Sequence, residues 1–124
     1  MQDEPTPIEL TKAVADFLRN DITPLVTGHS AFKLRVAINI LDLVVRQSTL
    51  AEASDAVETT SLKRLLGIDG ALPDLNRALT EKIASGEIDL TTPGLSEHLW
   101  QTTMAKLAVD QPNYASYKRE LERK

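Results

Sequence analysis

Hydrophobic residues recur along the chain at the three- and four-residue spacing of amphipathic helices. In the first such segment, one stripe consists of Leu10, Val14, Phe17 and Leu18. The preceding Thr6-Pro7-Ile8-Glu9 has the pattern of a capping box, with Thr6 as the N-cap and proline at the first helical position. This helix is expected to end near Asn20, before Thr23-Pro24, because proline disfavours helical geometry in the residue before it.

A second helix is predicted from Ser30 to about Ser48, and it is the centre of the predicted fold. Eight of the ten residues from 36 to 45 are apolar, and on a helical wheel they point in nearly every direction. Such a helix is expected to be enclosed by its neighbours. Its polar side is a narrow seam that consists of Arg35, Asn39, Asp42 and Arg46. Within this seam, Asp42 and Arg46 have the spacing of an ion pair.

Three further helices follow in the pattern. A third is predicted over about 52–66, although it could instead continue the second through Ser48-Thr49. A fourth is predicted over about 73–85, and Gly67 and Gly86 are the expected stops of the third and fourth. A fifth begins at Thr92-Pro93 and ends near Gln111, and residues 114–124 form a last short helix or a tail. Leu95, Leu99, Trp100, Met104 and Leu107 form one broad apolar face of the fifth helix, and Trp100 is expected in the core or at an interface.

The predicted fold is therefore all-α. No segment alternates between polar and apolar residues for long enough to indicate a strand. The length of 124 residues fits one domain, and short loops between helices favour antiparallel neighbours. We expect a single helical domain over residues 1–124, an antiparallel bundle of about five helices with a short C-terminal helix or tail.

Composition and charge exclude several classes of function. The chain has no cysteine, which removes disulfides, thiolate metal sites and cysteine nucleophiles. Its net charge of −4 provides no basic field for a nucleic-acid backbone. No apolar segment is long enough to span a bilayer, and the acidic N-terminus is unlike a signal peptide. We therefore expect a cytoplasmic protein with no nucleic-acid or membrane partner.

Signatures of catalysis are missing from the sequence. His29 and His98 stand alone, without the paired spacing of metal ligands, and both are expected on solvated surfaces. The segment Gly67-Ile68-Asp69-Gly70 lacks the lysine of a phosphate-binding loop, and no Gly-x-Ser-x-Gly elbow occurs. The sequence predicts no catalytic residue, no metal and no cofactor. It favours a protein without enzymatic activity, and an unrecognised small enzyme stays an alternative.

Two groups of polar side chains lie where apolar ones are expected. Arg35 and Asn39 border the apolar surface of the second helix, and Lys106 falls between Leu95 and Leu99 on the wheel of the fifth. In a structural interpretation, Arg35 and Asn39 belong to a solvated face. Lys106 then extends to water or pairs with Asp110 or Asp42. In a functional interpretation, these side chains border a groove that holds an anion or a partner's backbone.

The order of several sequence blocks resembles a known family. The blocks are Gln2–Thr6, Phe32–Asn39, Leu66-Gly67, Asp74–Leu79 and Lys106–Tyr114. They resemble an uncharacterised bacterial helical domain that occurs alone or fused to kinases similar to aminoglycoside phosphotransferases. Its genes often lie near those of acyl-CoA dehydrogenases. The family brings no established activity, so the resemblance implies a context and not a mechanism. The polar positions within these blocks include Arg35, Asn39, Asn76, Lys106 and Asn113.

The function predicted from the sequence is that of an accessory domain that binds another protein. The resemblance implies a phosphotransferase-like kinase as the partner. Homodimerisation through an apolar face of the first or fifth helix is the other association considered. A ligand or partner patch is predicted at Arg35, Asn39, Asn76, Lys106 and Asn113. The alternative is a small-molecule pocket between the second, fourth and fifth helices. Arg35 and Lys106 would there bind an anionic group such as phosphate or the head of an acyl-CoA.

Overall fold

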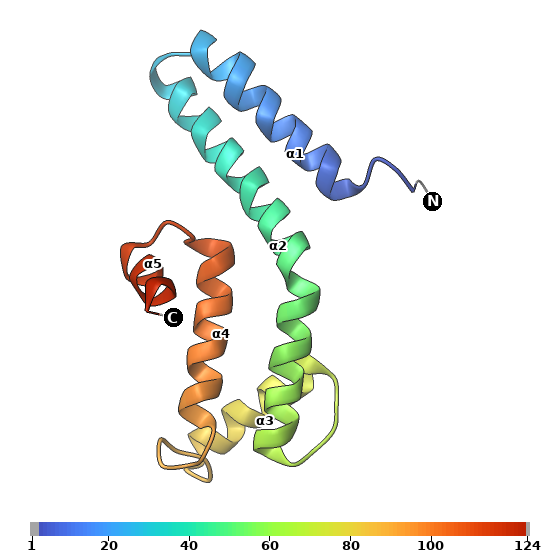
Figure 1. The fold of residues 1–124 in the computed structure, drawn as a ribbon, viewed down its shortest axis with the longest axis vertical. Helices are drawn as coiled ribbons and strands as arrows, with labels where there is room; N and C mark the ends of the chain where they lie inside the picture. The colour runs from blue at the N-terminus through green and yellow to red at the C-terminus, as the bar shows by residue number, and fades with distance from the viewer. Residues whose placement is uncertain (1–2, 124) are drawn as a thin grey trace. The chain divides into compact units, whose positions relative to one another are not determined.

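The computed structural model of the chain describes residues 3–123, and these residues form five α-helices and no strand. The all-α prediction is confirmed. Figure 1 shows the helices in chain order. Their bounds are α1 (Pro7–Phe17), α2 (Gly28–Leu66), α3 (Leu72–Ala84), α4 (Leu95–Asp110) and α5 (Ala115–Glu122). The first residue of the Gln2–Thr6 block and the last of the predicted tail, Lys124, lie outside the described residues.

The chain divides into two compact units, residues 1–50 and 51–124, and α2 contributes to both. The assignment of residues 1–124 to one domain stays a prediction. Among the described residues, no helix combines the length and the apolar character that crossing a bilayer requires.

The first unit consists of α1 and the N-terminal part of α2, which run side by side in opposite directions (Figure 1). The capping box at the start of α1 is confirmed. The Glu9 amide donates to Thr6 Oγ1 at 3.2 Å, and the Thr6 amide donates to Glu9 Oε2 at 2.7 Å. α1 ends at Phe17, and the chain continues through a π-helical turn (Leu18–Ile22) and a 3-10 turn (Thr23–Leu25).

The second and third predicted helices are one continuous helix of 39 residues, which begins at Gly28, ahead of the predicted cap Ser30. Neither glycine nor proline occurs between His29 and Leu66, so no residue type in this stretch forces an interruption. Threonine hydroxyl groups of α2 donate hydrogen bonds to carbonyl groups of the same helix. Thr49 Oγ1, for example, donates to the Val45 carbonyl at 2.7 Å. α2 ends where predicted, at Leu66, and the Gly67 that follows has a φ of 67°, which suits a residue without a side chain.

The prediction that α2 is enclosed by its neighbours is wrong for its N-terminal part. Ile38 is buried, with 5% of its surface exposed, but Ile40 is 57% exposed and Val36 42%. The physical reason is that a hairpin supplies α2 with one neighbouring helix, which covers one side. Arg19 of the turn after α1 donates to Asp42 of α2 at 2.6 Å and so joins the two segments.

The second unit has a closed apolar core. Its buried side chains come from α2, α3, the α3–α4 loop and α4, and they are Leu62, Leu66, Leu75, Leu79, Ile88 and Leu95. α3 and α4 lie close to their predicted bounds. α4 is preceded by Gly94, whose φ of 90° is a left-handed conformation that favours glycine. The core fixes the relative positions of the C-terminal part of α2 and of α4, which form the site described next.

Candidate functional site

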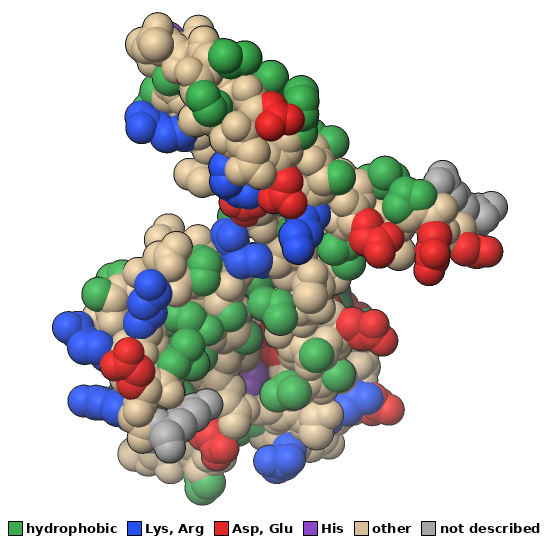
Figure 2. Space-filling view, turned by 45° about the horizontal axis from the view of Figure 1, so that its top comes forward, with side chains coloured by type: hydrophobic (Ala, Val, Ile, Leu, Met, Phe, Trp, Pro, Cys, Tyr) green, Lys and Arg blue, Asp and Glu red, His purple; other side chains and the backbone are tan. Residues whose placement is uncertain are grey.

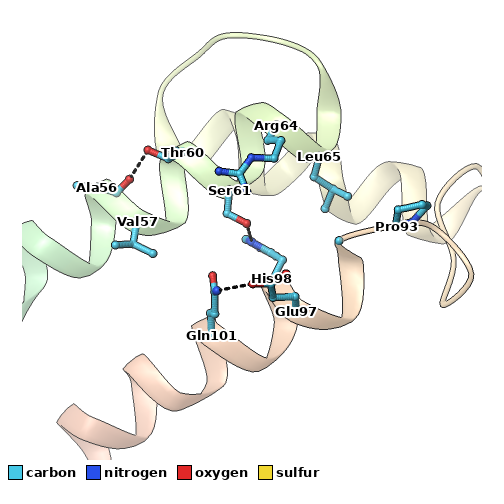
Figure 3. Close-up of a pocket in the computed structure, with 11 residues that line it drawn as sticks. Ala56, Val57, Thr60, Ser61, Arg64, Leu65, Pro93, Glu97, His98 and Gln101 are labelled. Atoms are coloured by element: carbon cyan, nitrogen blue, oxygen red, sulfur yellow. Dashed lines mark hydrogen bonds between the residues drawn. The ribbon is translucent and has the colours of Figure 1, made fainter.

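A groove of about 460 Å³ lies in the second unit, between the C-terminal part of α2 and α4 (Figure 3). α2 lines it with Val57, Ser61, Arg64 and Leu65, which share one face because they are three, four and seven or eight residues apart. α4 lines it with Glu97, His98 and Gln101, which share a face for the same reason. Apolar, neutral polar and charged groups therefore meet in one hollow.

A partly buried hydrogen bond joins the two helices across the groove. Ser61 Oγ and His98 Nδ1 lie 2.9 Å apart, and only 3% of the surface of His98 is exposed. In Figure 3 the two side chains point toward each other across the gap. The adjacent hydroxyl behaves differently, because Thr60 Oγ1 donates to the Ala56 carbonyl of its own helix at 2.9 Å. The Ser61 hydroxyl is thus turned outward from α2 to meet the imidazole.

Burial sets the charge state of this histidine. It lowers the pKa of His98 from the ordinary value of 6.5, because removal from water disfavours the charged ring. The negative charge of Glu58 opposes this effect and raises the pKa, but it is the smaller of the two influences. His98 is therefore neutral at pH 7, with one ring nitrogen that donates and one that accepts a hydrogen bond.

The charged side chains of the groove differ in their hydrogen-bond and ion-pair partners. Glu97 Oε1 accepts a hydrogen bond from Gln101 Nε2 at 3.0 Å. Arg64 has no ion pair with any of the residues that the structure describes, whereas its neighbour Lys63 contacts Asp69 at 2.6 Å. The groove therefore contains one guanidinium group that is available to an anion.

A second hollow, of about 250 Å³, shares Val57, His98 and Gln101 with the groove. Glu58 also lines this second hollow, where its Oε1 accepts a hydrogen bond from Asn76 Nδ2 at 2.8 Å. His98 is thus placed at the junction of two open spaces. Across residues 3–123, no three histidine, aspartate or glutamate side chains gather as metal ligands.

The solvated position predicted for His98 on α4 is wrong, because His98 is buried. Leu99 and Trp100 are 40% and 54% exposed, so Trp100 lies outside the core, and its place at an interface stays a prediction. The reason is that α4 carries apolar residues on both sides, so their period does not decide which side faces the core. The inner face instead follows Leu95, His98, Thr102, Ala105 and Val109. This regular alternation of three- and four-residue steps, with small side chains, was the signal available in the sequence.

The five residues of the predicted patch lie outside both hollows. Arg35 and Asn39 are exposed on α2 in the first unit. In the second unit, Asn76 is half-buried on α3 beside Glu58, and Lys106 and Asn113 are exposed. No hydrogen bond or ion pair of the described chain joins any two of the five, and Lys106 forms no ion pair there with Asp110. Their convergence stays a prediction.

Comparisons with known proteins place the chain in a family. No curated protein and no solved structure matches it. One family model, described as Domain of unknown function (DUF6285), matches residues 24–114. The matched span includes all of α2, α3 and α4, and with them every residue that lines the groove. The chain belongs to the DUF6285 family, a domain of unknown function.

Proposed function

We propose that the protein is a helical interaction module that binds another protein through the apolar surface of its first unit. The observation that supports this most strongly is the small core of that unit, where Ala15 and Ile38 are the buried apolar side chains among the described residues. Figure 2 shows hydrophobic side chains at the surface of this unit. The large apolar side chains that are more than a third exposed include Leu10, Val14, Phe17, Phe32, Val36, Ile40, Leu43 and Val44.

These exposed side chains form stripes. On α1, Leu10, Val14 and Phe17 are four and three residues apart, and each is about half exposed. On α2, Phe32, Val36 and Ile40 form a second stripe at four-residue spacing. Covering apolar surface stabilises an assembly by roughly 25 cal/mol per Å². Contiguous apolar surface of this kind is typical of protein–protein contacts.

The expected occupant is a helix of another protein. An amphipathic helix of a partner would pack its apolar face against the exposed stripes of α1 and α2. A membrane surface fits less well, because the polar side of α1 carries both signs of charge, as in Glu9, Lys12 and Asp16, and is not enriched in lysine and arginine. Since the sequence resembles domains fused to kinases similar to aminoglycoside phosphotransferases, we propose a kinase of this class as the partner. The cytoplasm is the proposed compartment.

The test is capture of a purified kinase of this class from the same host by the immobilised full chain. We expect the wild-type chain to retain the kinase and the double variant Val14→Gln/Phe17→Gln to bind at least about tenfold more weakly, because two anchors are lost. Ile83→Gln is the matched control, since Ile83 is 42% exposed on α3, outside the first unit. Circular dichroism checks that both variants keep their helices.

Three outcomes decide against the proposal or revise it. Binding that is unchanged in the double variant contradicts the proposed surface. Absence of kinase capture, with a chain that sediments as a monomer at all concentrations, contradicts the interaction function. A dimer that forms with increasing concentration and is lost in the double variant replaces the kinase with a second copy of the chain.

A further inference from the structure

We propose that the groove between α2 and α4 is a binding site for a small organic acid, a carboxylate with a short apolar body. In this site Arg64 binds the carboxylate, Val57 and Leu65 contact the apolar body, and His98 orients the molecule. The inference goes beyond the proposed interaction function, because all of these residues belong to the second unit.

The size and lining of the groove fit a small molecule. Its volume of about 460 Å³ lies within the roughly 300–1,000 Å³ of small-molecule sites. Such sites combine apolar walls with a few polar groups that fix the orientation of the ligand. Figure 3 shows Val57 and Leu65 on the α2 side of the same space that Ser61 and His98 border.

His98 supplies a polar side chain to the lining of this space. Its Nδ1 is engaged by Ser61, and the structure shows no hydrogen bond to its other ring nitrogen, Nε2. Every buried side-chain nitrogen or oxygen of the described residues has a hydrogen-bond partner. Because Nε2 has none, it is not fully buried and stays accessible to solvent. With the Ser61 hydroxyl donating to Nδ1, Nε2 carries the ring proton and donates to a carboxylate oxygen. In this tautomer, a histidine with 3% exposure retains one free donor.

The charges favour a carboxylate over a phosphate. The planar guanidinium group of Arg64 offers paired donors that match two carboxylate oxygens. Glu97 is the carboxylate among the lining residues, and Glu58 lies in the adjoining hollow. A ligand with one negative charge is attracted to Arg64 with less repulsion from these two groups than a doubly charged phosphate.

The test is titration of the full chain with hexanoate, followed by NMR of the Val57 and Leu65 methyl groups and of the His98 ring protons. We expect saturable shifts at these three residues. Hexanol and inorganic phosphate are run in parallel, because they supply the apolar body and the anion separately. Arg64→Gln is expected to weaken hexanoate binding by about tenfold or more, since a hydrogen bond to a charged group is lost.

Arg77→Gln is the matched control for Arg64→Gln. Arg77 contacts Asp74 on α3 and lies outside the groove, so its removal is expected to leave hexanoate binding unchanged. Ser61→Ala tests the role of His98 with little risk to the helix, because alanine is the best helix former. Loss of the hydroxyl frees the imidazole to turn, and binding is expected to weaken several-fold with altered His98 shifts.

Each contrary result overturns a part of the inference. Absence of saturable shifts with hexanoate at millimolar concentration overturns the site. Equal binding of hexanol, or binding unaffected by Arg64→Gln, overturns the role of the guanidinium group. Equal binding of inorganic phosphate overturns the requirement for an apolar body.

Discussion

The two units contain the same kind of helix but bury very different amounts of it. In the second unit, segments from α2, α3 and α4 enclose a core in which Leu62 and Leu75 are 0% and 1% exposed. In the first unit, two antiparallel segments leave Phe17 and Phe32 more than half exposed. Because isolated helices are marginal in water and gain most of their stability from packing, we expect the helices of the second unit to be the more stable ones. The difference also shows where surface is left for a partner.

The largest effect is expected from truncating the core of the second unit. Leu75→Ala removes a side chain that is 1% exposed, and it should lower the free energy of unfolding by about 2–5 kcal/mol. Leu10→Ala is the matched control in the first unit, where half of the side chain is already in water. Urea denaturation of both variants measures the difference. Equal losses in the two variants would remove the distinction between the units.

The next effect concerns the cap of α1. Thr6→Ala removes the Oγ1 that accepts from the Glu9 amide, although the backbone amide of residue 6 can still donate to Glu9, and it should destabilise α1 by about 1 kcal/mol. Because the first unit contributes little core, we expect this loss as faster amide exchange within α1 and not as a shift of the main unfolding transition. Hydrogen exchange resolved by residue measures it. A uniform increase of exchange across α3 and α4 would instead indicate that the units unfold together.

A smaller effect is expected from pH, and it is confined to the second unit. The pKa of His98 is lowered by burial, so the unfolded chain takes up a proton at a higher pH than the folded chain does. Stability is therefore full above the ordinary value of 6.5, and it decreases as the pH falls from there toward the lower pKa of the folded protein. His98→Gln should flatten this part of the profile in urea denaturation. An unchanged slope in that variant would show that another group titrates.

The smallest effect is expected from the ion pair of the first unit. Arg19→Gln removes the contact of Arg19 with Asp42 at 2.6 Å. The two side chains are 42% and 34% exposed. Exposed pairs contribute little and are weakened further by salt. We expect a slight loss of protection in α1 at low salt, which disappears at high salt. A loss that persists at high salt would assign Arg19 a packing role.

Local sequence signals predicted much of this fold and little of the site. The capping box at Thr6 and the stop at Gly67 were found because each depends on a few adjacent residues. The contact between Ser61 and His98 was missed because its partners are 37 residues apart. The apolar residues of α4 lie on both of its sides, so the sequence left Trp100 in the core or at an interface, and it is 54% exposed. Tertiary packing, not local pattern, decides such positions.

The central claim is that the second unit is stabilised by its own core, whereas the first depends on a partner. Native-state hydrogen exchange of the full chain tests it directly, at a concentration where sedimentation shows a monomer. We predict that amides of α3 and α4 exchange only through global unfolding, and that amides of α1 exchange through local opening at a clearly lower free energy. Equal protection of α1, α3 and α4 in the monomer would contradict the claim.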